Sequence, residues 1–266
     1  MQPMPQKFLL GLVLFILCSG AAYAAEPTVE NFFQVEKKNF AAQDGFFEKI
    51  GAFLFGSFAA EDRFLTISGV AVDADDNFYV VDSEKARVVV LDKNGKAKSR
   101  EDVGIGILKG PIGVAVDSKK NIYVTDAILN ELLIFSPDGK LLHEVKGSGE
   151  KNGEFLRPSG VLVDEEGKRI LVSDTGHHRL QIFSLDGEFL SFFGESGDKA
   201  SQFRFPTFIA KNSKRNIYVV DTINSRIQIF DEKLKQVGTF GDFGDALGYF
   251  GRPKGIAIDA KDRIYI

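Results

Sequence analysis

The sequence is poor in the residues that carry covalent and metal chemistry. Its 266 residues include one cysteine, three histidines and no tryptophan. Cys18 lies in a leader that we expect to be removed, so the mature chain would have no thiol for a disulfide or for catalysis. Motifs of serine hydrolases, phosphate-binding loops and dinucleotide-binding folds are also missing. The chain therefore carries none of the common catalytic signatures.

Positive charge is not in excess either. The chain has 33 Lys and Arg against 37 Asp and Glu. Because nucleic-acid binding usually requires a basic surface, we expect no nucleic-acid partner. The hydrophobic content of 44% and the charged content of 26% exclude intrinsic disorder, a collagen-like chain and a polytopic membrane protein.

The first 24 residues have the pattern of a secretory signal peptide. Lys7 precedes an apolar run at residues 8–17, and Ala22-Tyr23-Ala24 supplies small residues at a cleavage site. We expect cleavage, export to the periplasm or beyond the cell, and no stable membrane insertion afterwards. An uncleaved anchor and lipidation at Cys18 are the alternatives. The run is shorter than a bilayer span needs, and Leu17 before Cys18 is larger than lipidation favours.

The rest of the chain is built from an internal repeat. After a lead-in segment at residues 25–48, copies begin at Gly69, Gly113, Gly160, Phe208 and Gly255, at intervals of about 47 residues. Each copy contains short Val/Ile/Leu-rich runs separated by polar turns, and two Asp-Gly turns suit hairpins. Four antiparallel strands in each repeat predict an all-β protein, a β-propeller over residues 49–266.

The two ends of the repeat region do not match. Residues 49–56 resemble the outer strand of the fourth copy, and we expect them to complete the last blade and protect its edge. The fifth copy stops at Ile266, inside its second strand. We therefore expect four full blades and a partial fifth in a truncated chain. Roughly 75 further residues at this repeat length would complete six blades.

The repeat resembles the NHL repeat. The stretches that carry the resemblance are Arg157-Pro-Ser-Gly-Val-Leu-Val-Asp164, Asp174-Thr-Gly-His-His-Arg-Leu-Gln-Ile-Phe183 and Asp221-Thr-Ile-Asn-Ser-Arg-Ile-Gln-Ile-Phe230. The second copy departs from the pattern, with Glu131 at the position of Arg87, Arg179 and Arg226. The resemblance implies a six-bladed scaffold with many roles, among them binding modules, sensor domains of kinases, RNA-binding modules and an amidating lyase.

Propeller geometry predicts where a binding site would lie. The loop that connects two blades and the turn between strands two and three of a blade share one face. The residues we expect to bind a ligand or partner there are Lys109, Arg157, Arg204, Arg252, His177, His178 and Asn224, with Asn130 in the same turns. Such a face favours a small anionic ligand or an acidic protein. A purely solvating role for these cations is the alternative. The opposite face would gather acidic turns, including Asp75, Asp76, Glu165, Glu166 and Asp262.

The recurrent acids and the adjacent histidines favour structural roles. Asp82, Asp126, Asp174 and Asp221 each end a second strand, and we expect them to bind backbone N–H groups and the Arg five residues later. His177 and His178 are a poor metal pair because adjacent side chains of an extended chain point apart. The acidic turn at residues 73–77 lacks the Gly and bidentate Glu of a calcium loop. We therefore assign no catalytic residue, no metal and no cofactor.

These observations favour an exported binding or interaction scaffold rather than an enzyme. Two alternatives stay open. One is a propeller enzyme, a metal-dependent lyase or hydrolase with its site at the central channel. The other is the extracellular sensor part of a longer membrane protein.

Overall fold

The computed structural model describes residues 64–98, 102–244 and 248–266, and they form five antiparallel sheets. The strands follow the repeat. Blade 1 has β1 (Ile67–Val72), β2 (Phe78–Asp82) and β3 (Arg87–Leu91), and blade 2 has β4 (Pro111–Val116), β5 (Ile122–Asp126), β6 (Glu131–Phe135) and β7 (Leu141–Lys146). Blade 3 has β8 (Pro158–Asp164), β9 (Arg169–Asp174), β10 (Arg179–Ser184) and β11 (Phe189–Phe193), and blade 4 has β12 (Pro206–Lys211), β13 (Ile217–Asp221), β14 (Arg226–Phe230) and β15 (Gln236–Phe240). Blade 5 begins with β16 (Ala257–Ile258) and β17 (Ile264–Tyr265).

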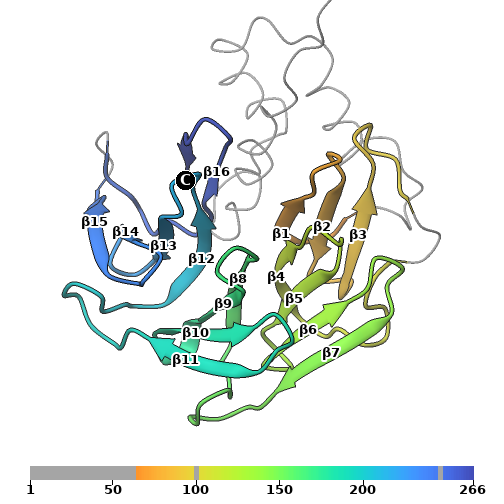
Figure 1. The fold of residues 1–266 in the computed structure, drawn as a ribbon, viewed down its shortest axis with the longest axis horizontal. Helices are drawn as coiled ribbons and strands as arrows, with labels where there is room; N and C mark the ends of the chain where they lie inside the picture. The colour runs from red at the N-terminus through yellow and green to blue at the C-terminus, as the bar shows by residue number, and fades with distance from the viewer. Residues whose placement is uncertain (1–63, 99–101, 245–247) are drawn as a thin grey trace, which may run out of the picture.

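The five sheets follow one another around an axis, as the sequence predicts (Figure 1). Their first strands, β1, β4, β8, β12 and β16, lie innermost, and β7, β11 and β15 lie outermost. Each sheet therefore runs outward in chain order. Blade 1 differs, because its described residues form a three-stranded sheet. Two isolated bridges, Leu91 to Ala97 and Val88 to Val103, occupy the position of its fourth strand.

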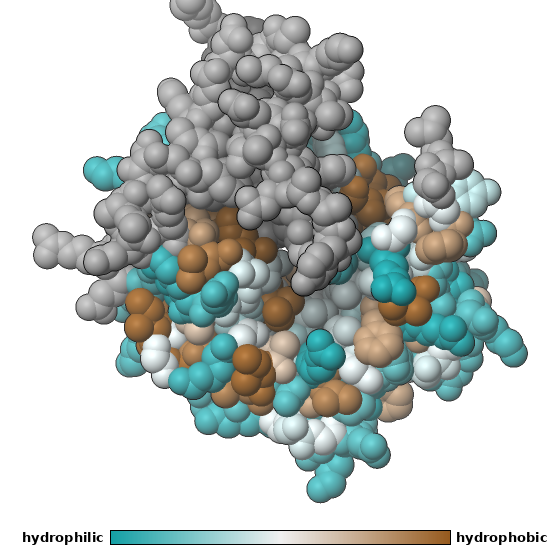
Figure 2. Space-filling model, turned by 180° about the vertical axis from the view of Figure 1, so that it is seen from behind, coloured by the Kyte–Doolittle hydropathy of each residue, from teal (hydrophilic) through white to brown (hydrophobic). Residues whose placement is uncertain are grey.

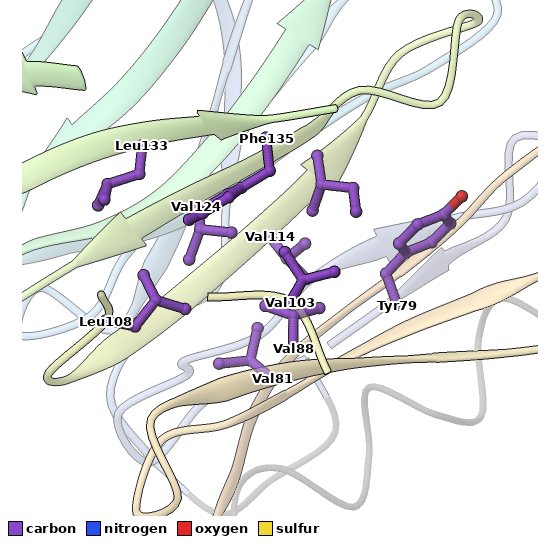
Figure 3. Packing of buried hydrophobic residues seen from close by; sticks show 10 residues of the cluster. Tyr79, Val81, Val88, Val103, Leu108, Val114, Val124, Leu133 and Phe135 are labelled. Carbon is purple, nitrogen blue, oxygen red and sulfur yellow. The ribbon is translucent and has the colours of Figure 1, made fainter. Parts of the chain in front are cut away.

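Packing between blades explains the continuous apolar runs of the second and third strands. Along β6, Leu133 and Phe135 point toward blade 1, whereas Leu132 and Ile134 point toward blade 3. Both faces of the strand are buried, so no polar alternation is possible. Figure 3 shows one such interface, in which Leu133, Phe135, Val124 and Val114 of blade 2 lie on one side and Val81 and Val88 of blade 1 on the other.

Phenylalanines of the connecting loops complete these interfaces. Phe155 and Phe203 are fully buried, and each precedes the first strand of a blade. Phe155 lies 5.4 Å from the ring of Phe183, and Phe203 lies 6.0 Å from that of Phe230. Burying a ring of this size contributes about 1.5–3 kcal/mol relative to leaving it exposed. Each of these two connecting loops is therefore anchored by one buried phenylalanine ring.

The inner strands are also joined by hydroxyl groups. Ser68 Oγ donates to Ile112 O at 3.1 Å, Ser159 Oγ donates to Thr207 O at 3.3 Å, and Thr207 Oγ1 donates to Lys254 O at 2.8 Å. Neighbouring backbones approach closely here, and a Cβ on Gly113 would lie 2.1 Å from Ser159 O. Glycine is therefore required at this position in the first three blades, whereas blade 4 has Phe208 there.

Several expectations lie outside the described residues: the signal peptide at 1–24, the lead-in segment at 25–48 and the outer strand at 49–56. The part of the chain that the structure describes contains no helix that could span a bilayer. Its short 3₁₀ helix, η2 (Thr175–His177), lies between β9 and β10.

Candidate functional site

The connecting loops and the turns between second and third strands share one face, which we call the loop face. The carboxylate that ends each second strand joins the two loops. Lys109 N donates to Asp126 at 2.7 Å, and Leu156 N donates to Asp174 at 2.8 Å. The same bond recurs in blade 4, where Arg204 N donates to Asp221. In each of these blades the recurrent carboxylate therefore holds the connecting loop against the end of the second strand.

These recurrent carboxylates are buried and paired in blades 3 and 4. Asp174 accepts from Arg179 Nε at 2.9 Å and from Gln181 Nε2 at 2.9 Å. The Arg and Gln side chains also donate to Glu154 O in the connecting loop. Each carboxylate thus clamps its loop through an Arg and a Gln, as the spacing of five residues predicts for the Arg. The negative charge is neutralised internally and is not available to a ligand.

His177 and Asn224 occupy equivalent positions and reinforce the clamps. His177 Nδ1 lies 2.8 Å from Asp174 Oδ2, and Asn224 Nδ2 donates to Asp221 Oδ2 at 2.9 Å. Asn224 also donates to Gly197 O at 2.8 Å. The sequence predicts ligand contacts for both side chains. In the structure both form hydrogen bonds within the fold.

His178 and Asn130 are a second equivalent pair, and each joins two blades. Asn130 Oδ1 accepts from Arg157 N at 2.7 Å, and His178 Nδ1 accepts from Phe205 N at 3.0 Å. Burial, followed by the charges of His177 and Arg204, lowers the pKa of His178 below its ordinary value. The neutral ring therefore accepts the bond, with its proton on Nε2.

In blade 2 the recurrent carboxylate holds its connecting loop without an arginine. Glu131 stands at the Arg position, and Asp126 instead accepts backbone N–H groups of Lys109, Gly110, Ile128 and Leu129. Burial raises the pKa of Glu131, Lys146 lowers it, and Glu144 and Asp126 raise it again. The net shift is upward. Asp126 therefore holds the loop of blade 2 through backbone donors, without an arginine.

Cations and apolar side chains remain exposed on the loop face. Lys109, Arg157, Arg204 and Arg252 are exposed, and none of them forms an ion pair with a described residue. Four apolar side chains of the same loops, between 40% and 68% exposed, are Ile128, Leu156, Phe205 and Ile223. We call these eight residues the rim. Figure 2 shows hydrophobic and hydrophilic residues interspersed over the described blades, with no single continuous patch.

The sequence predicts that the opposite face gathers acidic turns, but the structure shows charges of both signs there. Its turns alternate in charge from blade to blade, and the charges pair across blade boundaries. Lys120 of blade 2 pairs with Asp75 of blade 1, and Arg215 of blade 4 lies 3.5 Å from Glu166 of blade 3. Ser213 Oγ donates to Asp262 of blade 5 at 2.7 Å. The sequence does not reveal these pairs, because the two partners lie in neighbouring copies of the repeat, about one repeat apart in the chain.

A cavity of about 240 Å³ lies on the axis. It is lined by the inner strands β1, β4, β8, β12 and β16. Its described lining residues are aliphatic or alanine except for Lys211. Lys211 is not among the binding residues that the sequence analysis predicts. The signal was present, because the corresponding residues of the other copies are Val72, Val116, Val163 and Ile258.

Family models match the chain in two places. An NHL repeat model matches residues 64–91, and a model described as a 6-bladed beta-propeller matches residues 107–195. The chain is a β-propeller that contains an NHL repeat. No curated protein matches it.

Solved structures share the fold at low identity. A streptogramin B lyase is 17% identical over 74% of this chain, with a TM-score of 0.56. Virginiamycin B lyase from Staphylococcus aureus is 15% identical over 76% of it, also at 0.56. A protein of unknown function from Bacteroides caccae is 17% identical over 65% of it, at 0.53. The chain spans 60%, 63% and 66% of these three structures, respectively, so the similarity describes the scaffold.

Proposed function

We propose that this propeller is an exported binding scaffold whose rim holds an acidic protein partner. One observation carries the proposal: the recurrent carboxylates that end the second strands are buried and bonded within the fold, whereas Lys109, Arg157, Arg204 and Arg252 are exposed and form no ion pair with a described residue. The rim is locally basic although the whole chain has a net charge of −4. Such a local field favours an acidic surface.

The apolar members of the rim favour a protein over a small anion. Ile128, Leu156, Phe205 and Ile223 come from three blades, and exposed side chains of this kind can anchor a partner's apolar groups. Cations beside them would fix the orientation of an acidic chain. A small anion could use the cations but not the apolar positions between them.

The similarity to lyases motivates the alternative of a propeller enzyme. That similarity is one of fold, and nothing among the described residues adds to it. His177 and His178, which that alternative would use first, are bonded to Asp174 and to the backbone of Phe205.

The proposal is tested with a fluorescent twelve-residue peptide of alternating Glu and Leu, and with a Lys/Leu peptide as its opposite. Fluorescence anisotropy would measure binding to the wild type and to the double variant Arg157→Glu/Arg204→Glu. We expect the acidic peptide alone to bind, binding to weaken with added salt, and the variant to lose at least tenfold in affinity.

Lys119→Glu/Lys214→Glu is the matched control, because both lysines are exposed on the opposite face. It makes the same charge change and should bind like the wild type. Equal losses in the two double variants would show that net charge alone drives binding and would refute the role of the rim. Failure of the wild type to bind either peptide would also refute it.

A further inference from the structure

The inner strand of blade 4 departs from the repeat at two adjacent positions beside the axial cavity. Lys211 replaces an aliphatic residue. Asn212 replaces the aspartate that the other copies carry as Asp73, Asp117, Asp164 and Asp259. Each change makes the formal charge of blade 4 one unit more positive than that of the other blades at the same position. Residues that recur in every blade are explained by the architecture, whereas these two occur in blade 4 alone among the copies.

The cavity combines three kinds of surface. The aliphatic side chains of its lining supply apolar contact, and Lys211 is the charged residue among the described lining residues. The inner strands are sheet edges, with a neighbour on one side only (Figure 1). An edge strand presents backbone N–H and C=O groups on its free side. The axial cavity therefore offers hydrogen-bond donors and acceptors as well as apolar surface.

One of the two partners of Lys211 is displaceable. Lys211 Nζ donates to Asp164 Oδ1 at 2.7 Å and to Glu166 Oε2 at 3.1 Å. Asp164 is buried and also accepts from Arg169 Nε. The Glu166 side chain is 65% exposed and lies 3.5 Å from Arg215. Glu166 can therefore leave Lys211 for solvent and keep a cation beside it, which opens one carboxylate position on the ammonium.

We propose that the axial cavity binds a small molecule that bears a carboxylate and amide groups, of the size of a dipeptide. Its carboxylate replaces Glu166 on Lys211 Nζ, and its amide groups bond to the free edges of the inner strands. The volume of about 240 Å³ is below the roughly 300–1,000 Å³ typical of larger ligand pockets, which fits a small ligand. Backbone edges recognise amide groups, as in strand addition, whereas a pure hydrocarbon would leave them unpaired.

Lys211 stays protonated for this role. Burial alone would lower the pKa of Lys211, but its bonds to Asp164 and Glu166 outweigh burial and raise the pKa above the ordinary value of 10.5. The ammonium is thus a fixed charge at neutral pH. The cavity is separate from the rim, so this site can exist whether or not the rim binds a partner.

The experiment compares N-acetyl-Ala-Ala with its C-terminal amide by isothermal calorimetry on the full chain. We expect the acid to bind and the amide to bind at least tenfold more weakly. Lys211→Met keeps the aliphatic stem without the charge and should reduce acid binding at least tenfold. Glu166→Gln removes the competing carboxylate and should tighten acid binding severalfold. Lys214→Met, an exposed lysine of the adjoining turn, is the matched control and should change nothing.

Equal binding of acid and amide, or wild-type affinity in Lys211→Met, would overturn the proposal. So would an absence of binding to the wild type at millimolar acid, or binding of octanoate in preference to the dipeptide. If Lys211→Met does not fold by circular dichroism, Ala210→Leu provides an independent test, because it fills the cavity and leaves Lys211 unchanged. This variant should also lose acid binding, and retention of affinity would place the ligand elsewhere.

Discussion

The clamp around Asp221 allows a quantitative test of how the loop face is held. Its carboxylate is buried and accepts from Arg204 N at 2.7 Å, Asn224 Nδ2 at 2.9 Å, Arg226 Nε at 2.8 Å and Gln228 Nε2 at 3.2 Å. Asp221→Ala removes all four acceptor contacts. The Arg226 side chain, 15% exposed, then keeps its charge without a counterion.

The expected cost follows from that stranded charge. Removing one partner of a buried ion pair costs about 3–5 kcal/mol, because the other charge stays desolvated. Arg226 retains bonds to Asp198 O, Lys199 O and Gln202 O, which places the cost near the lower end of that range. A loss of about 3 kcal/mol corresponds to a fall in Tm of about 6–12 °C for a chain of this size.

The assay is equilibrium unfolding in urea, monitored by circular dichroism. Asp231→Ala is the matched control, because Asp231 also accepts two backbone N–H groups but in an outer hairpin turn. It should cost less than about 1 kcal/mol. Arg226→Ala and the double variant complete a cycle with an expected coupling of at least about 1 kcal/mol. Equal costs for Asp221→Ala and Asp231→Ala, or strict additivity of Asp221→Ala with Arg226→Ala, would refute the clamp.

Two further predictions concern the blade contacts and the turns of the opposite face. Gly113→Ala should lower the free energy of unfolding by about 1–3 kcal/mol, because its Cβ would meet Ser159 O, whereas Gly251→Ala, whose Cβ meets nothing within 4 Å, should not. Urea unfolding of both variants checks this, and equal effects would contradict it. Burial alone would raise the pKa values of Asp73 and Asp164, but hydrogen bonds hold both below the ordinary 3.8. The stability that they contribute is therefore present above pH 3.8 and lost as the pH falls through their folded-state pKa values. Urea titrations between pH 6 and 2.5 should show this loss, and Asp73→Asn should lessen it; a profile unchanged in that variant would count against the assignment.

The architecture could be read from the sequence because it depends on local and repeated signals. Continuous apolar runs such as β13 are typical of strands buried on both faces, and Asp-Gly turns such as Asp186-Gly187 close hairpins. The pairing of Asp174 with Arg179 could also be predicted, since the two face each other across adjacent strands. These features repeat, so each copy supports the reading of the others.

The candidate site could be predicted only in part. The sequence identified the loop face and the cations Lys109, Arg157 and Arg204, because loop positions follow from strand order. It could not distinguish those exposed cations from side chains such as His178, whose ring accepts a bond from Phe205 N in the next blade. Equivalent sequence positions differ here in what the neighbouring blade presents to them.

The sequence by itself determined the strands, their order and the blade that they form, because these depend on residues close together in the chain. Only the tertiary structure decided which charges are neutralised between blades. Lys211 meets Asp164, and Lys120 meets Asp75, across blade boundaries that bring residues about one repeat apart into contact. Burial and partners at those boundaries separate the neutralised charges, Lys211 beside the axial cavity among them, from the exposed cations of the rim.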